Sequence, residues 1–355
     1  MKACIFSFTR NGANLSINVK KRLMDSGYTV DCFTVKSFVS LSKELRALEG
    51  DLDIITAQAF ARCSALIFIG SSGIAVRKIA PFIKDKASDP AVICIDEKGE
   101  FVIPLLSGHI GGANSLARVI AEWLGACPVI TTATDVNGLF AVDEWAKKNN
   151  MYICDLKTVK RISADLLNDT PIGLYSDFEL QGELPPNVLL NSDCESGIAI
   201  TLEEQKKPFA TTLKLIPKII CLGIGCKKDV SCERIEELVL DILENKRISI
   251  NSISDIATID LKKDEKGLLD LAEKYSIPLS FYSAEELGRV SGKFSESDFV
   301  KSITGIDNVC ERAAVIKSDK GKLLVKKTAK NGVTVALAQT SWRVNFEYSN
   351  GWDRL

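Results

Sequence analysis

The sequence predicts an α/β protein of several domains, and three observations support this prediction. Short apolar runs rich in Val, Ile and Phe alternate with segments that carry apolar residues at helical spacing, which is typical of a mostly parallel sheet covered by helices. Glycine-rich stretches follow several of the predicted strands, where ligand loops lie in such sheets. A chain of 355 residues also exceeds what one core usually organises, so two or three domains are expected.

The composition excludes several classes of protein. The chain is 46% hydrophobic and 26% charged with a formal net charge of −1, as in an ordinary soluble globular protein. It has no basic excess that would suit nucleic acid and no apolar stretch of about eighteen residues that would cross a membrane, so neither partner is expected. Its eleven cysteines form no Cys-x-x-Cys pair. That pattern is typical of reduced, mostly buried thiols in a cytoplasmic protein and predicts no metal site.

Residues 1–137 predict an N-terminal α/β domain with a mostly parallel sheet, because apolar runs alternate there with amphipathic segments. The predicted strands are residues 2–8, 28–35, 65–69, 91–95, 101–103 and 128–131. The predicted helices are residues 13–24, 73–83 and 113–124. Since parallel strands end at the same edge of a sheet, the loops at residues 70–73, 107–114 and 132–135 are expected to line one cleft.

Residues 138–216 predict a small middle α+β domain that connects its neighbours. Helical patterns cover residues 140–148 and 155–168, and short strand-like pieces follow at residues 172–175, 188–190 and 198–201. The segment is small, polar and interrupted by prolines, which does not indicate a catalytic core.

A new α/β pattern begins at Pro217 and predicts a three-layer domain over residues 217–340. Its predicted strands are residues 218–222, 278–282, 322–325 and 333–337, and its predicted helices are residues 231–243, 268–274, 284–287, 298–302 and 309–316. Residues 223–228 are interpreted as a glycine loop made basic by Lys227 and Lys228. That loop lacks the third glycine of a dinucleotide fingerprint. Residues 341–355 are expected to form a flexible tail.

The stretch at residues 105–114 holds the single histidine of the chain, His109, among three glycines. A glycine-rich loop before a helix presents backbone N–H groups to an anionic or polarised ligand. An unperturbed histidine titrates near pH 6.5, which suits a proton carrier. The alternative interpretation is a tight turn capped by a histidine.

The other two loops carry candidate residues with equally plain alternatives. Ser71 and Ser72 could bind a ligand or could cap the helix that begins near Gly73. Arg77 could pair with a ligand carboxylate or could lie on a solvated surface. Asp135 is either a turn former or a carboxylate of the site.

Several of these motifs resemble the CbiG family. The matching stretches are residues 70–77, 104–114, 131–138, 223–226 and 281–287. The resemblance covers roughly residues 1–340, including the division into three parts. The chain departs from the family pattern at residues 227–229, where an arginine pair and a glycine are usual, and at residues 309–312, where a small-residue helix is usual.

The resemblance implies hydrolysis of cobalt-precorrin-5A in the anaerobic route to cobalamin. The substrate is a cobalt-bearing macrocycle with acetate and propionate side chains and a δ-lactone. Water opens the lactone, and the extruded ring carbon leaves with its methyl group as acetaldehyde, which gives cobalt-precorrin-5B. Because cobalt arrives within the substrate, neither a cofactor nor a protein metal site is expected. Neighbouring enzymes of the corrin pathway are candidate partners, and an oligomer is compatible with the sequence.

The lactone chemistry assigns expected roles to the motif residues. A water activator and donors for the tetrahedral oxyanion are needed. His109 is the expected activator with Asp135 as a second catalytic candidate, and the N–H groups of Gly111, Gly112 and Ser72 are candidate donors. The expected substrate-binding residues are Ser71, Ser72, Gly73, Arg77, Ser107, Gly108, Gly111, Gly112, Asn114, Thr132, Gly223, Gly225 and Lys227.

Two other classes of function remain as alternatives. A non-catalytic tetrapyrrole carrier would use the same loops only to bind carboxylates. A sugar-phosphate or nucleotide enzyme would use the glycine loops as phosphate cradles, but neither a Walker lysine loop nor metal-holding carboxylates stand near the glycines.

Overall fold

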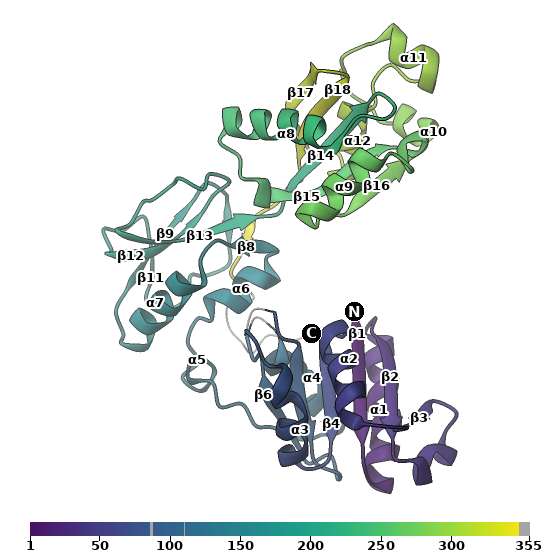
Figure 1. Ribbon diagram of the computed structural model, residues 1–355. Coiled ribbons are helices and arrows are strands. Elements are labelled where there is room, and N and C mark those ends of the chain that lie inside the picture. The colour runs from purple at the N-terminus through teal and green to yellow at the C-terminus, as the bar shows by residue number, and fades with distance from the viewer. Residues whose placement is uncertain (86–87, 110, 348–355) are drawn as a thin grey trace. The chain divides into compact units, whose positions relative to one another are not determined.

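The computed structural model describes residues 1–85, 88–109 and 111–347 of the chain (Figure 1). The chain forms two compact units, Met1–Glu144 and Trp145–Leu355. The predicted middle and C-terminal domains therefore belong to one unit. Across the described ranges, no helix has both the length and the apolar character that crossing a membrane requires.

A single twisted sheet forms the centre of the first unit. Its strands are β1 (Lys2–Ser7), β2 (Thr29–Thr34), β3 (Leu45–Ala47), β4 (Ala65–Ile69), β5 (Ala91–Ile95), β6 (Phe101–Leu106) and β7 (Cys127–Pro128). They lie in the order β3-β2-β1-β4-β5-β6-β7. Every neighbouring pair is parallel except β5 and β6, which are antiparallel. Each residue of β4 and β5 is buried, as continuous apolar runs predict.

Helices cover both faces of this sheet. They are α1 (Arg10–Asp25), α2 (Leu52–Arg62), α3 (Ser72–Ile79) and α4 (Ala113–Leu124). The unit also contains the short helix α5 (Ala133–Val136) and the 3₁₀ turns η1 (Lys36–Leu41) and η2 (Ala80–Phe82). Apolar residues of α1 and α4 pack in one core with Ile5, Ile67 and Ile93, whereas those of α2 and α3 pack in a second core with Phe6 and Phe68. Alternate residues of the strands thus face two separate helix layers. The predicted mostly parallel α/β sheet is confirmed.

The reversed direction of β6 decides where the glycine loops lie. Leu106 at the end of β6 pairs with Val92 at the start of β5, whereas Val102 pairs with Ile95 at the end of β5. Gly70, which follows β4, donates its N–H to the Ile95 carbonyl at 2.8 Å. The loop at residues 107–114 therefore begins at the edge of the sheet opposite to residues 70–73. The expectation that all three loops share one edge is wrong.

A tight turn before β6 is the physical reason. The carboxylate of Asp96 accepts the N–H groups of Lys98 at 3.0 Å and Phe101 at 2.7 Å, and Gly99 has a positive φ of 72°. This short turn returns the chain antiparallel to β5, because a parallel return needs a long crossover. β7 is parallel to β6, so the loop at residues 132–135 shares the edge of residues 107–114. The predicted strand at residues 128–131 is shorter than expected and ends at Pro128.

The second unit begins with a small mixed sheet. Its strands are β8 (Met151–Ile153), β9 (Ile172–Ser176), β11 (Val188–Leu190), β12 (Ser196–Ile200) and β13 (Thr211–Pro217). They lie in the order β11-β9-β12-β13-β8, and β8 alone runs antiparallel to its neighbour. The helices of this part of the chain are α6 (Val142–Lys148), which crosses the boundary between the units, and α7 (Leu156–Leu167).

A three-layer α/β arrangement follows, as predicted. Its strands are β14 (Ile220–Cys226), β15 (Ile253–Ile259), β16 (Leu279–Tyr282), β17 (Lys322–Lys330) and β18 (Val333–Gln339), in the order β16-β15-β14-β18-β17. Its helices are α8 (Cys232–Lys246), α9 (Lys266–Tyr275), α10 (Ala284–Gly288), α11 (Asp298–Thr304) and α12 (Cys310–Lys317), with 3₁₀ turns η3 (Ile250–Ser252) and η4 (Asp260–Lys262). Apolar residues of α8 and α9 pack on one face of the sheet, and those of α12 pack in separate clusters.

Gly223 and Gly225 lie inside strand β14 and not in a loop, so the interpretation of residues 223–228 as a glycine loop is wrong. A Cβ atom on Gly223 would lie 1.9 Å from the carbonyl oxygen of Cys310 and 2.8 Å from the backbone nitrogen of Ala314. Glycine here lets the backbone of α12 approach the strand. The requirement for glycine at position 223 is therefore one of packing.

The prediction of a flexible tail is wrong for residues 344–346, and residues 348–355 lie outside the described residues. Strand β19 (Val344–Asn345) pairs in parallel with β10 (Leu180–Gln181). The carbonyl of Asn345 accepts the indole N–H of Trp145 at 2.8 Å, and the Phe346 ring stacks on Trp145 at 4.6 Å. Phe346 is buried, and burial of an aromatic ring holds this end of the chain in place.

Because its cysteine thiols are buried, we expect the free energy of unfolding to fall at alkaline pH. All eleven cysteines are free, and burial raises the pKa of Cys94, Cys154, Cys226 and Cys310 from 9.0 to about 11. As the pH rises from 9 to 11, the unfolded chain loses these protons while the folded chain keeps them. The stability contributed by the neutral thiols is complete below pH 9 and is lost through this window.

The measurement is the urea midpoint of unfolding at intervals between pH 8 and 11. We expect the midpoint to fall across this range in the wild type. A variant carrying both Cys94→Ala and Cys226→Ala should show a shallower fall, because two of the titrating groups are removed. An equal fall in both proteins would contradict a contribution from these thiols.

Candidate functional site

The loop that contains His109 is folded tightly onto the start of α4. Ser107 has a positive φ of 58°, and its carbonyl accepts the N–H of Ala113 at 3.1 Å. A Cβ atom on Gly108 would lie 2.7 Å from Asn114 Oδ1, and one on Gly111 would lie 2.3 Å from Ser107 Cβ. These two glycines are therefore required by close packing within the loop.

The loop uses some of the groups that the sequence offered to a ligand. The Gly112 N–H donates to the His109 carbonyl at 2.9 Å, so it is already engaged and is not a free donor for an oxyanion. The Ser107 side chain is buried. Both residues shape the loop and so position the His109 side chain.

Three carboxylates surround the His109 imidazole. Nε2 lies 3.5 Å from Asp135, and Nδ1 lies 3.8 Å from Asp143 and 3.9 Å from Glu144. Asp143 and Glu144 stand in the first turn of α6. The imidazole is largely buried, with 19% of its side chain exposed. Both ring nitrogens thus face groups that can hold a proton or orient a water molecule.

Asp135 is fixed by two side chains of α4. Arg118 Nη2 donates to Asp135 Oδ1 at 2.8 Å, and Asn114 Nδ2 donates to Asp135 Oδ2 at 2.9 Å. Asn114 Nδ2 also donates to Thr132 Oγ1 at 2.9 Å. The loops at residues 107–114 and 132–135 therefore meet, as expected. A carboxylate held in this way is rigid, so it is suited to orienting the imidazole.

The groups around the imidazole are mostly acidic. Three carboxylates face the ring, and the Arg118 guanidinium pairs with the one on Asp135. Such a group suits proton transfer at the imidazole. Among the residues that the structure describes, no group of His, Cys, Asp and Glu has the arrangement of metal ligands.

The loop at residues 70–73 is not part of this cluster, because it lies at the opposite edge of the sheet. Ser71 precedes α3 but makes no side-chain capping bond, and Arg77 Nη1 donates to the carbonyl of Gly73 at 3.2 Å within the same helix. The Arg77 guanidinium thus folds back on its own helix. The structure does not bring Ser71, Ser72, Gly73 or Arg77 to His109.

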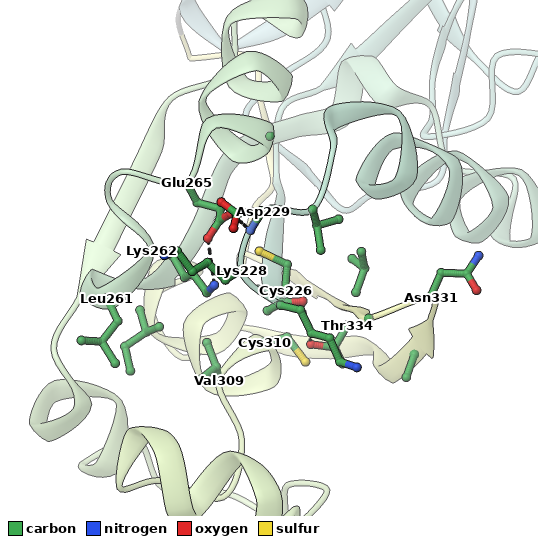
Figure 2. A pocket seen from close by; sticks show the side chains of 18 of the residues that line it. Cys226, Lys228, Asp229, Leu261, Lys262, Glu265, Val309, Cys310, Asn331 and Thr334 are labelled. Carbon is green, nitrogen blue, oxygen red and sulfur yellow. Dashed lines mark hydrogen bonds and ion pairs between the residues drawn. The ribbon is translucent and has the colours of Figure 1, made fainter.

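A large cavity lies in the second unit (Figure 2). Its volume is about 1190 Å³, and it opens beyond the carboxyl ends of β14 and β15, where ligands bind in open α/β sheets. Gly225 and Lys227 line it and Gly223 does not. Figure 2 shows Lys228, Lys262 and Glu265 on one side, with Thr334 on the other.

Sequence reasoning missed three residues of the His109 cluster, namely Arg118, Asp143 and Glu144. A signal was present in each case. Arg118 follows Asn114 by four residues on a predicted helix, which places the two on one face. Asp143 and Glu144 are adjacent acids in the first turn of a predicted helix. Their distance from His109 depends on tertiary folding, which no local pattern encodes.

Known proteins of cobalamin biosynthesis are similar to this chain over nearly its whole length. Family models described as Cobalamin synthesis G N-terminal, Cobalamin biosynthesis central region and Cobalamin synthesis G C-terminus match residues 54–135, 140–217 and 220–338. A protein of Salmonella typhimurium named cobalt-precorrin-5A hydrolase is 35% identical over 345 residues, which cover 94% of this chain and 96% of that protein. One of the same name from Priestia megaterium is 32% identical, with 94% of each chain covered. A Methanocaldococcus jannaschii protein named probable cobalt-precorrin-5A hydrolase is 32% identical over 77% of this chain and 84% of its own.

Proposed function

The chain belongs to the CbiG family, and from this premise we propose that it hydrolyses cobalt-precorrin-5A in cobalamin biosynthesis. The observation that carries the proposal is the likeness to hydrolases of that name over 94% of the chain. The reaction opens the δ-lactone and releases acetaldehyde, which leaves cobalt-precorrin-5B. Cobalt enters as part of the substrate, and no further cofactor takes part. The reduced cysteines suit a cytoplasmic site for this reaction.

The His109 cluster is the proposed centre of the reaction. Asp135, held by Arg118 and Asn114, lies 3.5 Å from Nε2 and orients the imidazole. The imidazole removes a proton from a water molecule that attacks the lactone carbonyl, and the imidazolium then protonates the departing ring oxygen. Asp143 and Glu144, on the Nδ1 side, stabilise the imidazolium.

Acetaldehyde release follows from the opened lactone. The hydroxyl group freed by hydrolysis stands on the extruded carbon, which also carries the methyl group. Loss of the hydroxyl proton to a base lets the bond between this carbon and the macrocycle break. The carbon leaves as acetaldehyde, while the electron pair and a proton remain with the macrocycle. The proton acceptors around His109 suit both steps.

The direct test is turnover by the purified protein. Cobalt-precorrin-5A is incubated with it, acetaldehyde is measured by coupled reduction with NADH, and the macrocyclic product is identified by its mass. Stoichiometric acetaldehyde and the ring-contracted product are expected. Binding of the substrate without acetaldehyde would instead favour a non-catalytic tetrapyrrole carrier.

Arg118 is expected to act on turnover through Asp135. Arg118→Gln removes the 2.8 Å contact that fixes this carboxylate, and we expect kcat to fall by roughly 10–100-fold because the imidazole loses its orientation. KM should change by less than about twofold, since Arg118 is proposed to contact no substrate. Steady-state acetaldehyde release measures both constants.

Two controls separate positioning from folding. Arg22→Gln removes the same charge from α1, at a residue outside the cluster, and should leave kcat unchanged. Arg118→Gln should also have little further effect in a His109→Ala background, because the two residues act in one chain of contacts. Equal effects of Arg118→Gln with and without His109 would contradict this role.

A further inference from the structure

The cavity of the second unit is large and has an apolar lining. At about 1190 Å³, it exceeds the roughly 300–1,000 Å³ that is usual for sites of small ligands. Leu261 and Ile303 line it although 65% and 61% of their surfaces are exposed. Val230, Ile259 and Val309 contribute further apolar surface. The cavity thus suits a ligand with a broad apolar body.

Ammonium groups without ion-pair partners line the same cavity. Lys227, Lys228, Lys266 and Lys327 form no salt bridge with any residue that the structure describes. By contrast, Lys262 pairs with Glu265 at 2.9 Å, and Lys330 pairs with two carboxylates on α8 at 2.8 Å each. The lysines without salt bridges are therefore available for anionic groups of a ligand, and three of them, Lys227, Lys228 and Lys327, are considered below.

Carboxylates also line the cavity, and two of them are already held. Glu265 accepts the Lys262 ammonium and, at 2.5 Å, the Asp229 N–H. Glu233, in the first turn of α8, accepts hydrogen bonds from the Glu233 backbone N–H and from the Ser231 hydroxyl, and these bonds lower the pKa of its carboxyl group. Asp229, Asp264 and Asp270 complete the acidic lining. The total charge of the lining is therefore nearly balanced, and selection must come from the positions of the free lysines.

Three helices begin at the cavity wall. They are α8, α9 and α12. The Asn308 side chain already caps α12, because its Oδ1 accepts the Glu311 N–H at 2.9 Å. The amino ends of helices favour negative charge through their N–H groups and dipoles. Carboxylates of the chain already stand at two of these ends, Glu233 in the first turn of α8 and Glu265 before α9, so the lysines are the main attraction for a ligand anion.

We propose that this cavity of the second unit is a ligand site, which binds the ring face and peripheral carboxylates of a tetrapyrrole. The ligand class rests on the proposed function. The lysines without salt bridges suit the carboxylates of such a ligand, and the apolar lining suits its ring. Lys227, Lys228 and Lys327 contact the carboxylates, and Leu261 and Ile303 cover the ring.

The test measures binding of uroporphyrin I, a metal-free tetrapyrrole with eight carboxylates, by quenching of its fluorescence. The variant with Lys227→Ala, Lys228→Ala and Lys327→Ala should raise the Kd about tenfold or more at low salt, and its Kd should depend less on salt. The control replaces Lys218, Lys246 and Lys322, which are exposed on the same unit outside the cavity, with alanine. This control changes the net charge equally and should leave the Kd within about twofold.

Three outcomes would overturn the proposal. They are no binding of uroporphyrin I by the wild-type chain, an unchanged Kd in the cavity variant, and an equal loss in both variants. Melting temperatures close to wild type show that both variants fold. Turnover of cobalt-precorrin-5A is measured in the same preparations. Binding that depends on the lysines, without turnover, would refute the proposed function and support this site. Turnover with binding that does not depend on the lysines would support the proposed function and refute this site.

Discussion

Replacing His109 with alanine is expected to lower kcat by roughly 10²–10⁴-fold, which is the usual contribution of a positioned general base. Asp135, the carboxylate nearest to the ring, cannot replace it, because Arg118 and Asn114 hold that carboxylate. Steady-state acetaldehyde release from the two proteins gives the ratio. The melting temperature should change little, since His109 belongs to neither hydrophobic core of the first unit.

The pH dependence distinguishes catalysis from a structural role. A histidine acts as a base only when it is unprotonated, so the wild-type rate should rise with pH through an acidic limb that the variant lacks. His109→Gln keeps a polar side chain of similar size and is expected to be as inactive as His109→Ala. Near-normal turnover in either well-folded variant would move the base to Asp143 or Glu144, which face Nδ1.

Local sequence patterns located the buried elements of the first unit accurately. Residues 65–69, 91–95 and 113–124 were predicted to the residue as β4, β5 and α4. The first two are continuous apolar runs, and the helix lies between Gly112 and Gly125, both with positive φ. Where apolar runs end at glycines, local chemistry determines the boundary.

The missed strand β15 shows where such patterns fail. Ser254 and Asp255 interrupt its apolar run, so the segment has no clear alternation. The structure explains the polar residues, because Asp255 pairs with Lys317 of α12 at 2.8 Å. A long-range ion pair of this kind leaves no trace in the local sequence. Tertiary context therefore overrides the local pattern at this strand.

The candidate site was predicted in part for a related reason. The contact of Asn114 with Asp135 follows from two loops at one edge of a sheet, and this was expected. The direction of β6 places the loop at residues 70–73 at the other edge of the sheet, away from His109. The turn at Asp96 and Gly99 sets that direction. A loop of a few residues that contains glycine between two apolar runs is a hairpin signal. This hairpin separates residues 70–73 from His109.

Gly223→Ala is expected to destabilise the second unit by about 1–3 kcal/mol or more, the cost of forcing atoms into a packed interior. The added Cβ would lie 1.9 Å from the carbonyl of Cys310, which is helix backbone, so α12 as a whole must move away from β14. Since Val309 and Cys310 line the cavity, uroporphyrin I binding should weaken when α12 moves.

Gly225→Ala is the matched control in the same strand. Its Cβ would meet the Thr334 hydroxyl at 2.6 Å, and that side chain can rotate at the cost of its 3.1 Å bond to the Gly225 carbonyl, which is worth roughly 1 kcal/mol. Urea unfolding of the two variants tests the difference, and equal losses of stability would show that α12 does not need glycine at position 223.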